Sequence, residues 1–285
     1  MENARKLGNS MASCYLGSMH LNGCGVPKGN KKAFEMYSEA CNRGEKKDSA
    51  LSLGIMHYHG FFGPVDYEKA FNLFQESFKA FNKKAAFNLG LCYYHGHGVT
   101  KDVVQAFKYL DMAHKSGVRR ACTNLSQLYL EGNGVEKDLV KAFELHKEAY
   151  DFRFDPISSS YYLGLHYLNG TGVEKDFKKA ATLFLECFNL QKQKGSFDYP
   201  EAAYYLGREL LSGEVVAKDE KQAFKLFEFA KIHDSNLGLL WVGICYLKGH
   251  GCEKDYSKAL EIFESSLLAD NSQSNYYLGV MHANG

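Results

Sequence analysis

Three side chains that could perform acid–base chemistry recur at a fixed step in the first half of the chain. His59, His95 and Glu131 follow one another at intervals of 36 residues. An imidazole and a carboxylate can act as general base and general acid if both come within hydrogen-bond reach of one substrate. These residues therefore define one hypothesis, a catalytic or accessory module with a histidine-rich site.

The same region contains two closely spaced histidine pairs, His57 with His59 and His95 with His97. A structural zinc site needs about four ligands around one centre. His57 stands 36 residues before Tyr93, at a position expected to face the core, whereas His59 should point to the surface. We therefore predict one structural and one surface histidine, and no metal site.

Short Gly-x-Gly segments occur five times, but none follows a predicted strand or continues as the longer nucleotide-binding pattern Gly-x-Gly-x-x-Gly. They are better explained as turns, and no cofactor is predicted. The eight cysteines do not recur at one fixed spacing. Together with a first segment that has no apolar signal-peptide core, this favours reduced thiols and a cytoplasmic location.

Charge and hydropathy exclude two classes of partner. The 34 basic and 33 acidic residues leave a net charge of +1, without the basic excess typical of nucleic-acid-binding proteins. The sequence contains no apolar run approaching the roughly 18 residues that would span a bilayer. We expect neither nucleic-acid binding nor direct membrane insertion.

A column of small residues provides the frame that must position all of these side chains. It recurs every 36 to 43 residues, at Gly17, Gly54, Gly90, Ser126, Gly164, Gly207, Gly243 and Gly279. A glycine follows six residues later each time, the last being Gly285, and an alanine follows sixteen residues after the first seven, at Ala33, Ala70, Ala106, Ala142, Ala180, Ala223 and Ala259. A fixed period of this length is the signature of a helical repeat protein.

One unit shows what each repeat should look like. Ala86, Leu89, Gly90 and Tyr93 share one face of a helix that the next glycine should end. An aspartate then caps a second helix. The sequence predicts an all-α fold of helix pairs, in which the small residues allow close helix packing despite a cost of about 1 kcal/mol for a glycine within a helix.

The segment from Leu89 to Ala106 reads Leu-Gly-x-x-Tyr-x-x-Gly-x-Gly-Val-x-x-Asp-x-x-x-Ala, and Leu163 to Ala180 repeats it. This pattern resembles the Sel1-like repeat, a relative of the tetratricopeptide repeat. The resemblance implies an α/α superhelical solenoid of about seven and a half repeats over residues 11–285. Units would begin near residues 11, 48, 84, 120, 158, 201, 237 and 273, after an N-terminal segment, 1–10, that could form a cap. It also implies a non-enzymatic adaptor or scaffold that binds other proteins.

Helical geometry locates the surface where a partner would bind. At about 100° per residue, the residue just before each Leu-Gly step should lie opposite the packed face, and the resemblance to tetratricopeptide-like arrays implies that this side faces the concave groove. We call this set the inner row: Tyr15, Ser52, Asn88, Asn124, Tyr162, Tyr205, Trp241 and Tyr277. The seventh residue after each inner-row position, which includes His59, His95 and Glu131, should face the same side. Aromatic side chains often anchor partners, and asparagine amides can hold an extended peptide backbone.

The sequence predicts a groove for a protein or peptide partner formed by Tyr162, Tyr205, Trp241, Tyr277, Asn88, Asn124, His59 and His95. Two alternatives remain open beside the histidine-rich module. The aromatic residues could instead stack on one another and seal the inner wall. The last unit has a first helix but no second, with apolar Tyr276, Leu278 and Val280, so the terminal repeats could also associate with another copy of the chain.

Overall fold

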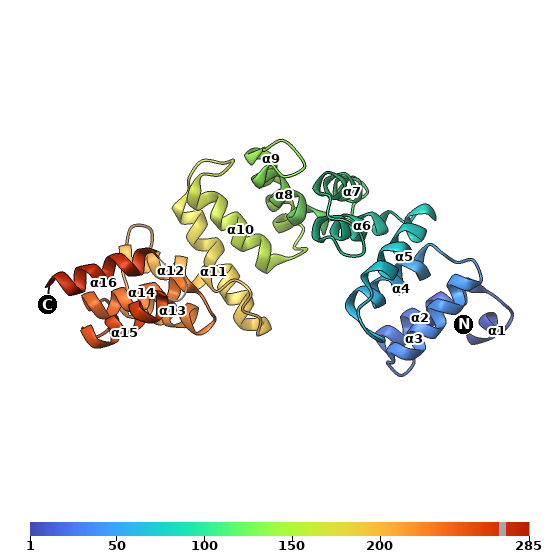
Figure 1. Ribbon diagram of the computed structural model, residues 1–285, viewed down its shortest axis with the longest axis horizontal. Helices are drawn as coiled ribbons and strands as arrows, with labels where there is room; N and C mark the ends of the chain where they lie inside the picture. The colour runs from blue at the N-terminus through green and yellow to red at the C-terminus, as the bar shows by residue number, and fades with distance from the viewer. Residues whose placement is uncertain (268–271, 285) are drawn as a thin grey trace. The chain divides into compact units, whose positions relative to one another are not determined.

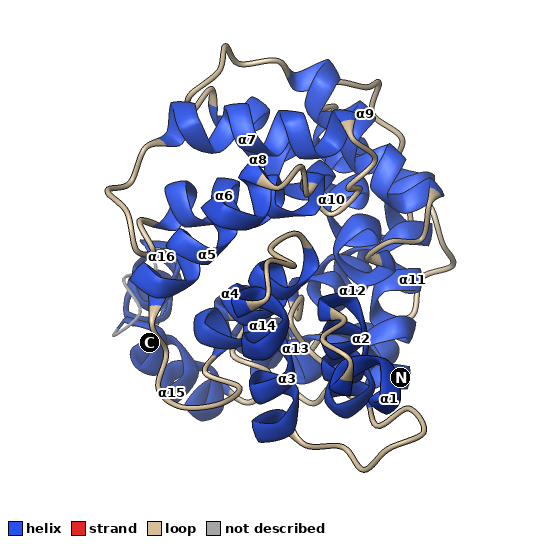
Figure 2. Ribbon diagram, turned by 90° about the vertical axis from the view of Figure 1, so that its right-hand side faces the viewer, coloured by secondary structure: helices blue, strands red, loops and turns tan. Residues whose placement is uncertain are grey.

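A computed structural model describes residues 1–267 and 272–284 of the chain, which form sixteen α-helices and no strand (Figures 1 and 2). The helices are α1 (Glu2–Lys6), α2 (Ser10–Asn22), α3 (Asn30–Asn42), α4 (Asp48–His59), α5 (Tyr67–Lys79), α6 (Lys83–His95), α7 (Val103–Lys115), α8 (Ala121–Glu131), α9 (Leu139–Asp151), α10 (Pro156–Asn169), α11 (Phe177–Lys194), α12 (Glu201–Ser212), α13 (Glu220–Ile232), α14 (Asn236–Lys248), α15 (Tyr256–Leu267) and α16 (Ser272–Asn284). The all-α helix-pair repeat is confirmed.

The helices belong to two compact units, Met1–Asp138 and Leu139–Gly285. In the first unit α2 packs on α3, α4 on α5 and α6 on α7; in the second, α10 packs on α11, α12 on α13 and α14 on α15. Each second helix also packs on the first helix of the following pair within its unit. The prediction of one continuous array over residues 11–285 stays a prediction.

The helix boundaries follow the predicted chemistry. Gly96 ends α6 with a φ of 76°, in the left-handed region that glycine adopts without a side-chain penalty. The carboxylates of Asp66, Asp102, Asp176 and Asp219 accept backbone N–H groups at the starts of α5, α7, α11 and α13. Gly29 precedes α3 and offers no such side chain. Gly285, the last glycine of the predicted series, lies outside the described residues.

The glycine column makes room for a large side chain of the second helix in the same repeat. A Cβ atom added at Gly54 would lie 2.5 Å from Cε1 of Phe74, and one added at Gly207 would lie 2.7 Å from Cε1 of Phe227. The contacted residue is always the fourth after the buried alanine: Tyr37, Phe74, Leu110, Phe184, Phe227 and Phe263. The small column therefore accommodates a buried ring or leucine rather than the alanine itself.

The second glycine of the Gly-x-Gly turn allows close contact between successive repeats. Gly98 has a φ of 72°, and a Cβ atom there would lie 2.1 Å from the carbonyl oxygen of Tyr67. That carbonyl belongs to the second helix of the preceding repeat. A side chain would collide with backbone, which no rotamer change relieves, so this glycine lets successive repeats stack.

The N-terminal segment packs on the first repeat. The Arg5 guanidinium in α1 contacts the Glu39 carboxylate of α3 at 2.8 Å, and Arg43 donates a hydrogen bond to the Arg5 carbonyl at 2.9 Å. Glu39 also pairs with Arg43 at 2.6 Å. The role of residues 1–10 as a cap stays a prediction.

Candidate functional site

The four aromatic residues of the inner row in the second unit each stack on the preceding second helix. Tyr162 lies parallel to His146 with ring centroids 4.8 Å apart, and Tyr205 stacks on Phe184 at 4.7 Å. Trp241 contacts Phe227 at 5.5 Å, and Tyr277 stacks on Phe263 at 5.3 Å. All four are partly exposed. Each supporting ring is buried, so each inner-row ring has a fixed orientation.

The supporting rings are themselves held by the glycine column. Phe184 lies between Gly164 of its own repeat and Tyr205 of the next, and Phe227 lies likewise between Gly207 and Trp241. The inner row therefore continues the core outward, ring on ring. This packing agrees with the alternative that the aromatic residues seal a wall, and their partial exposure keeps a binding role open.

Trp241 of the inner row contacts both a buried ring and a cation. The Arg208 guanidinium lies 4.5 Å from the centre of the indole ring and donates a hydrogen bond of 3.1 Å to the Tyr204 hydroxyl. Arg208 is exposed, and Tyr204 is buried beside Phe227. A guanidinium over an indole face is a cation–π contact. It places a positive charge at the rim of an aromatic surface.

The polar members of the inner row in the first unit are held less tightly. Asn88 is half-buried, and its amide donates to the Lys84 carbonyl of its own helix at 3.3 Å. Asn124 is also half-buried. Ser52 donates to the Asp48 carbonyl at 2.9 Å.

His59 and His95 are both exposed, and each stacks on a neighbouring ring. His59 stacks on Phe61 at 5.2 Å, and His95 stacks on His97 at the same centroid distance. His97 continues the stack onto Tyr67 at 4.0 Å and shares a hydrogen bond of 2.9 Å with the Tyr58 hydroxyl. Burial, followed by the charges of His97 and Lys101, lowers the pKa of His95.

The structure does not bring the proposed catalytic residues together. Within the described residues, His59, His95 and Glu131 share no hydrogen bond, ion pair or ring contact with one another. Glu131 instead accepts a hydrogen bond from Gln127 of its own helix. General acid–base catalysis requires each group to lie within hydrogen-bond reach of the substrate, so the histidine-rich catalytic module stays a prediction.

Three buried cysteines lack the environment of nucleophiles. The eight cysteines, all of them among the described residues, form no disulfide, and burial raises the pKa of Cys92, Cys187 and Cys245 to about 12. Because the thiolate is the reactive species, these thiols are poorly suited to attack a substrate at neutral pH.

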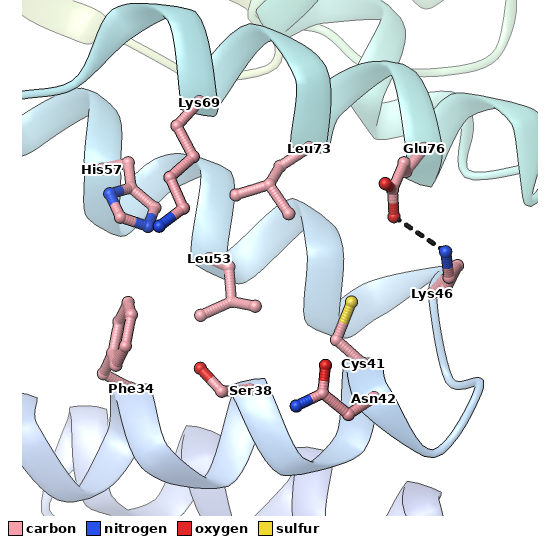
Figure 3. A pocket seen from close by; sticks show the side chains of 10 residues that line it. All are labelled: Phe34, Ser38, Cys41, Asn42, Lys46, Leu53, His57, Lys69, Leu73 and Glu76. Carbon is pink, nitrogen blue, oxygen red and sulfur yellow. Dashed lines mark ion pairs between the residues drawn. The ribbon is translucent and has the colours of Figure 1, made fainter.

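One groove was not predicted from the sequence. It lies between α3 and α5 with α4 below, encloses about 580 Å³, and brings together Phe34, Ser38, Leu53, His57, Lys69 and Leu73, among others (Figure 3). Two features of the sequence could have indicated this groove. The turn Phe61-Phe62-Gly63-Pro64 replaces the Gly-x-Gly segment in the second repeat, and His57 stands where the next repeat has Tyr93. Phe62 packs on Phe34 at 5.0 Å, and Phe34 contacts His57 edge to face at 5.6 Å.

Comparison with known proteins connects this geometry to a family. A family model described as Sel1 repeat matches residues 10–45, 47–80, 83–118, 119–151, 157–186, 200–231 and 236–271. No curated protein matches the chain. In the described residues, no helix combines the length and apolar character needed to cross a membrane.

Solved structures share the fold. A protective antigen of uropathogenic Escherichia coli with an SLR fold is 23% identical, with a TM-score of 0.80 over 99% of this chain and 59% of that chain. A Sel1 repeat protein from Oxalobacter formigenes is 26% identical, with a TM-score of 0.65 over 96% and 76% of the two chains. Yeast Tom70 is 14% identical, with a TM-score of 0.50 over 98% and 55%. The chain thus spans about 59% of the length of the first of these proteins.

Proposed function

This chain belongs to the Sel1 repeat family, and from that membership we propose that it is a non-catalytic adaptor that binds a protein or peptide segment along the inner row. Helical repeats of this kind are typical of protein–protein interaction scaffolds, since they offer an extended surface in place of one enclosed site. The observation that carries the proposal is the series of partly exposed rings at Tyr162, Tyr205, Trp241 and Tyr277, each held by stacking on a buried side chain.

Rings held in this way suit binding for a physical reason. A side chain that is already ordered loses little conformational entropy when a partner covers it. Each ring offers apolar surface, and Arg208 beside Trp241 adds a cation at the rim. The exposed imidazoles of His59 and His95 and the amides of Asn88 and Asn124 would supply polar contacts in the first unit. Partners of the proposed kind are proteins, with no requirement for nucleic acid or membrane. A cytoplasmic location is proposed with them, because the eight cysteines, all within the described residues, form no disulfide.

The first test changes the exposed part of the row and leaves its buried support. Arg208→Ala removes the guanidinium, and Trp241→Phe shortens the ring while keeping an aromatic contact with Phe227. We expect each variant to lower the capture of a specific partner from native-host extract by about tenfold, equivalent to about 1.4 kcal/mol. Quantitative mass spectrometry of proteins retained on the immobilised chain measures it.

Ile232→Ala is the matched control, because Ile232 is 72% exposed and lies outside the inner row. It should leave the captured set unchanged. If all three variants captured as much partner as the wild-type chain and had its melting temperature, the inner row would not be the surface that binds the partner.

Self-association is a second candidate that one observation favours. At the C-terminal end of the second unit, a groove of about 690 Å³ is lined by Leu247, Tyr256, Leu260, Met281 and neighbouring residues. Tyr256 is 60% exposed and Tyr276 is 66% exposed. Contiguous apolar surface of this kind often marks an interface.

If this end self-associates, the apparent mass should rise toward that of a dimer as the concentration increases from about 1 to 100 µM, by mass action. The double variant Tyr256→Lys/Tyr276→Lys should remain monomeric across the range. Sedimentation velocity measures both proteins, and a wild-type chain that is monomeric at every concentration excludes the proposal.

A further inference from the structure

The groove between α3 and α5 differs from the inner row in position and in chemistry. Leu53 of α4 forms its floor, Leu73 of α5 points into it, and Phe34 and Ser38 line the wall from α3 (Figure 3). Leu53 is buried, whereas Phe34, Ser38 and Leu73 are half-buried. The volume of about 580 Å³ is sufficient for two or three amino-acid side chains.

One end of the groove holds a lysine without an ion pair. Lys69 extends toward His57 (Figure 3) and forms no ion pair within the described residues. At the other end, the Lys46 ammonium lies 3.1 Å from the Glu76 carboxylate. Among the lysine and glutamate side chains that line the groove, Lys69 is therefore the one outside an ion pair.

Two repeats of the second unit show a different arrangement. Lys179 and Lys258 occupy the position of Lys69, and each pairs with the aspartate that caps its own helix, Asp176 or Asp255, at 3.2 Å. Both ammonium groups also lie over a tyrosine ring, Tyr167 at 5.0 Å and Tyr246 at 5.3 Å.

In the second repeat His57 stands at the position of Tyr167 and Tyr246, and the Lys69 ammonium extends toward His57 (Figure 3) without an ion pair to Asp66 within the described residues. Asp66 still caps α5 through the backbone N–H of Lys69, at 3.0 Å. The local helix start is therefore the same, and what differs is the direction of the lysine side chain. The lysine ammonium is available to a ligand here and is occupied within the protein in the two other repeats.

The electrostatic state of His57 agrees with a site for an anion. Burial, followed by the charge of Lys69, lowers the pKa of His57, and Asp66 opposes this effect. Lys69 and Asp66 are the charged groups that face the ring. His57 is therefore neutral at pH 7, and an anion placed beside Lys69 would offset the lysine charge and favour protonation of the imidazole.

We propose that this groove binds a peptide segment in which a carboxylate stands next to an apolar side chain. The apolar side chain would contact Leu53, Leu73 and Phe34, and the carboxylate would pair with Lys69 and His57. The carboxylate can come from an acidic side chain or from a chain terminus, and both offer the same chemistry. The site is separate from the inner row and does not depend on a partner binding there.

The test uses three fluorescein-labelled hexapeptides and fluorescence anisotropy. The first has Leu-Glu-Leu in its middle and an amidated end, the second has no acidic residue and ends in a free Leu carboxylate, and the third is the second peptide with an amidated end. We expect the third not to bind. Binding of the first identifies an acidic side chain as the source of the carboxylate, and binding of the second identifies a terminus.

Lys69→Met should weaken binding by at least about tenfold, as expected for the loss of a charge-assisted contact. His57→Tyr, which restores the residue found at Tyr167 and Tyr246, should weaken it as well. Lys179→Met is the matched control in the second unit and should have no effect. Nuclear magnetic resonance of the His57 ring should show its pKa rising when the peptide binds.

Equal affinity of the Lys69→Met and wild-type chains, or binding of none of the peptides at millimolar concentration, would overturn the proposal. The thermal stability of each variant, measured by circular dichroism, shows whether it is folded. Arg208→Ala and Trp241→Phe should retain peptide binding at this groove, so a failure of the inner-row proposal and a failure of this one are distinguishable.

Discussion

Gly54→Ala is expected to lower the free energy of unfolding by about 2 kcal/mol. The new Cβ atom would lie 2.5 Å from Cε1 of Phe74 and 3.3 Å from the Ala70 carbonyl oxygen, so both a buried ring and a helix backbone would have to move. Overpacking of this kind costs up to about 3 kcal/mol, which exceeds the roughly 1 kcal/mol that alanine gains over glycine within a helix. Urea denaturation followed by circular dichroism measures the change.

The chain supplies its own control for this prediction. Gly279 occupies the same column in α16, and a Cβ atom there would meet no atom within 4 Å. Gly279→Ala should therefore leave stability unchanged or raise it by at most about 1 kcal/mol. If both variants were destabilised equally, the cost would come from the helix itself, and the packing explanation of the column would be wrong.

Acidification is expected to destabilise the second unit through a buried histidine pair. His146 and His166 are both almost fully buried, and Nδ1 of His146 lies 3.0 Å from Nε2 of His166. Burial, followed by the charge of His166, lowers the pKa of His146 to about 3, and burial also lowers the pKa of His166. Both residues are therefore neutral in the folded state near pH 7.

The unfolded chain takes up a proton at His146 near pH 6.5, whereas the folded chain does so only near pH 3. The stability contributed by the neutral imidazole is thus fully present above about pH 6.5, and it is lost progressively as the pH falls from about 6.5 toward 3. At pH 4.5 the loss from His146 should be about 2.7 kcal/mol, at roughly 1.36 kcal/mol for each pH unit. Protonation of His166 acts in the same direction.

The double variant His146→Phe/His166→Leu provides the comparison. Phenylalanine occupies the position of His146 in Phe184, Phe227 and Phe263, and leucine occupies the position of His166 in Leu128. Urea denaturation at several pH values should show a shallower fall in stability between pH 6.5 and 4.5 in this variant. Parallel curves for the two proteins would mean that other groups cause the acid sensitivity.

Position 146 also shows the limit of the sequence pattern. The repeat places residue 146 on a packed helical face, but it does not show that residue 166 of the next repeat shares a hydrogen bond with it. Similarly, the pattern predicts that Tyr205 and Trp241 belong to a row that faces the concave groove. That Phe184 and Phe227 cover one face of each ring became evident only from the contacts between neighbouring repeats.

The groove beside Lys69 was beyond prediction for a related reason. Lys69, Lys179 and Lys258 each stand three residues after the aspartate that caps their helix. Whether the ammonium pairs with that aspartate depends on the ring beside it, which is His57 in one case and tyrosine in the other two. Side-chain direction at an exposed position is decided by such contacts, since many rotamers of lysine are compatible with the helix.

The sequence by itself determined the helices, their boundaries and the positions that must be small, because these depend on local backbone chemistry repeated seven times. It determined the family for the same reason, since the repeated positions are the family pattern. The tertiary structure decided what each small residue accommodates and which rings support the inner row. It also decided that Lys179 and Lys258 form ion pairs with their capping aspartates. These features arise from side-chain packing between helices, within one repeat for the small residues and between neighbouring repeats for the inner row, which the repeat pattern does not specify.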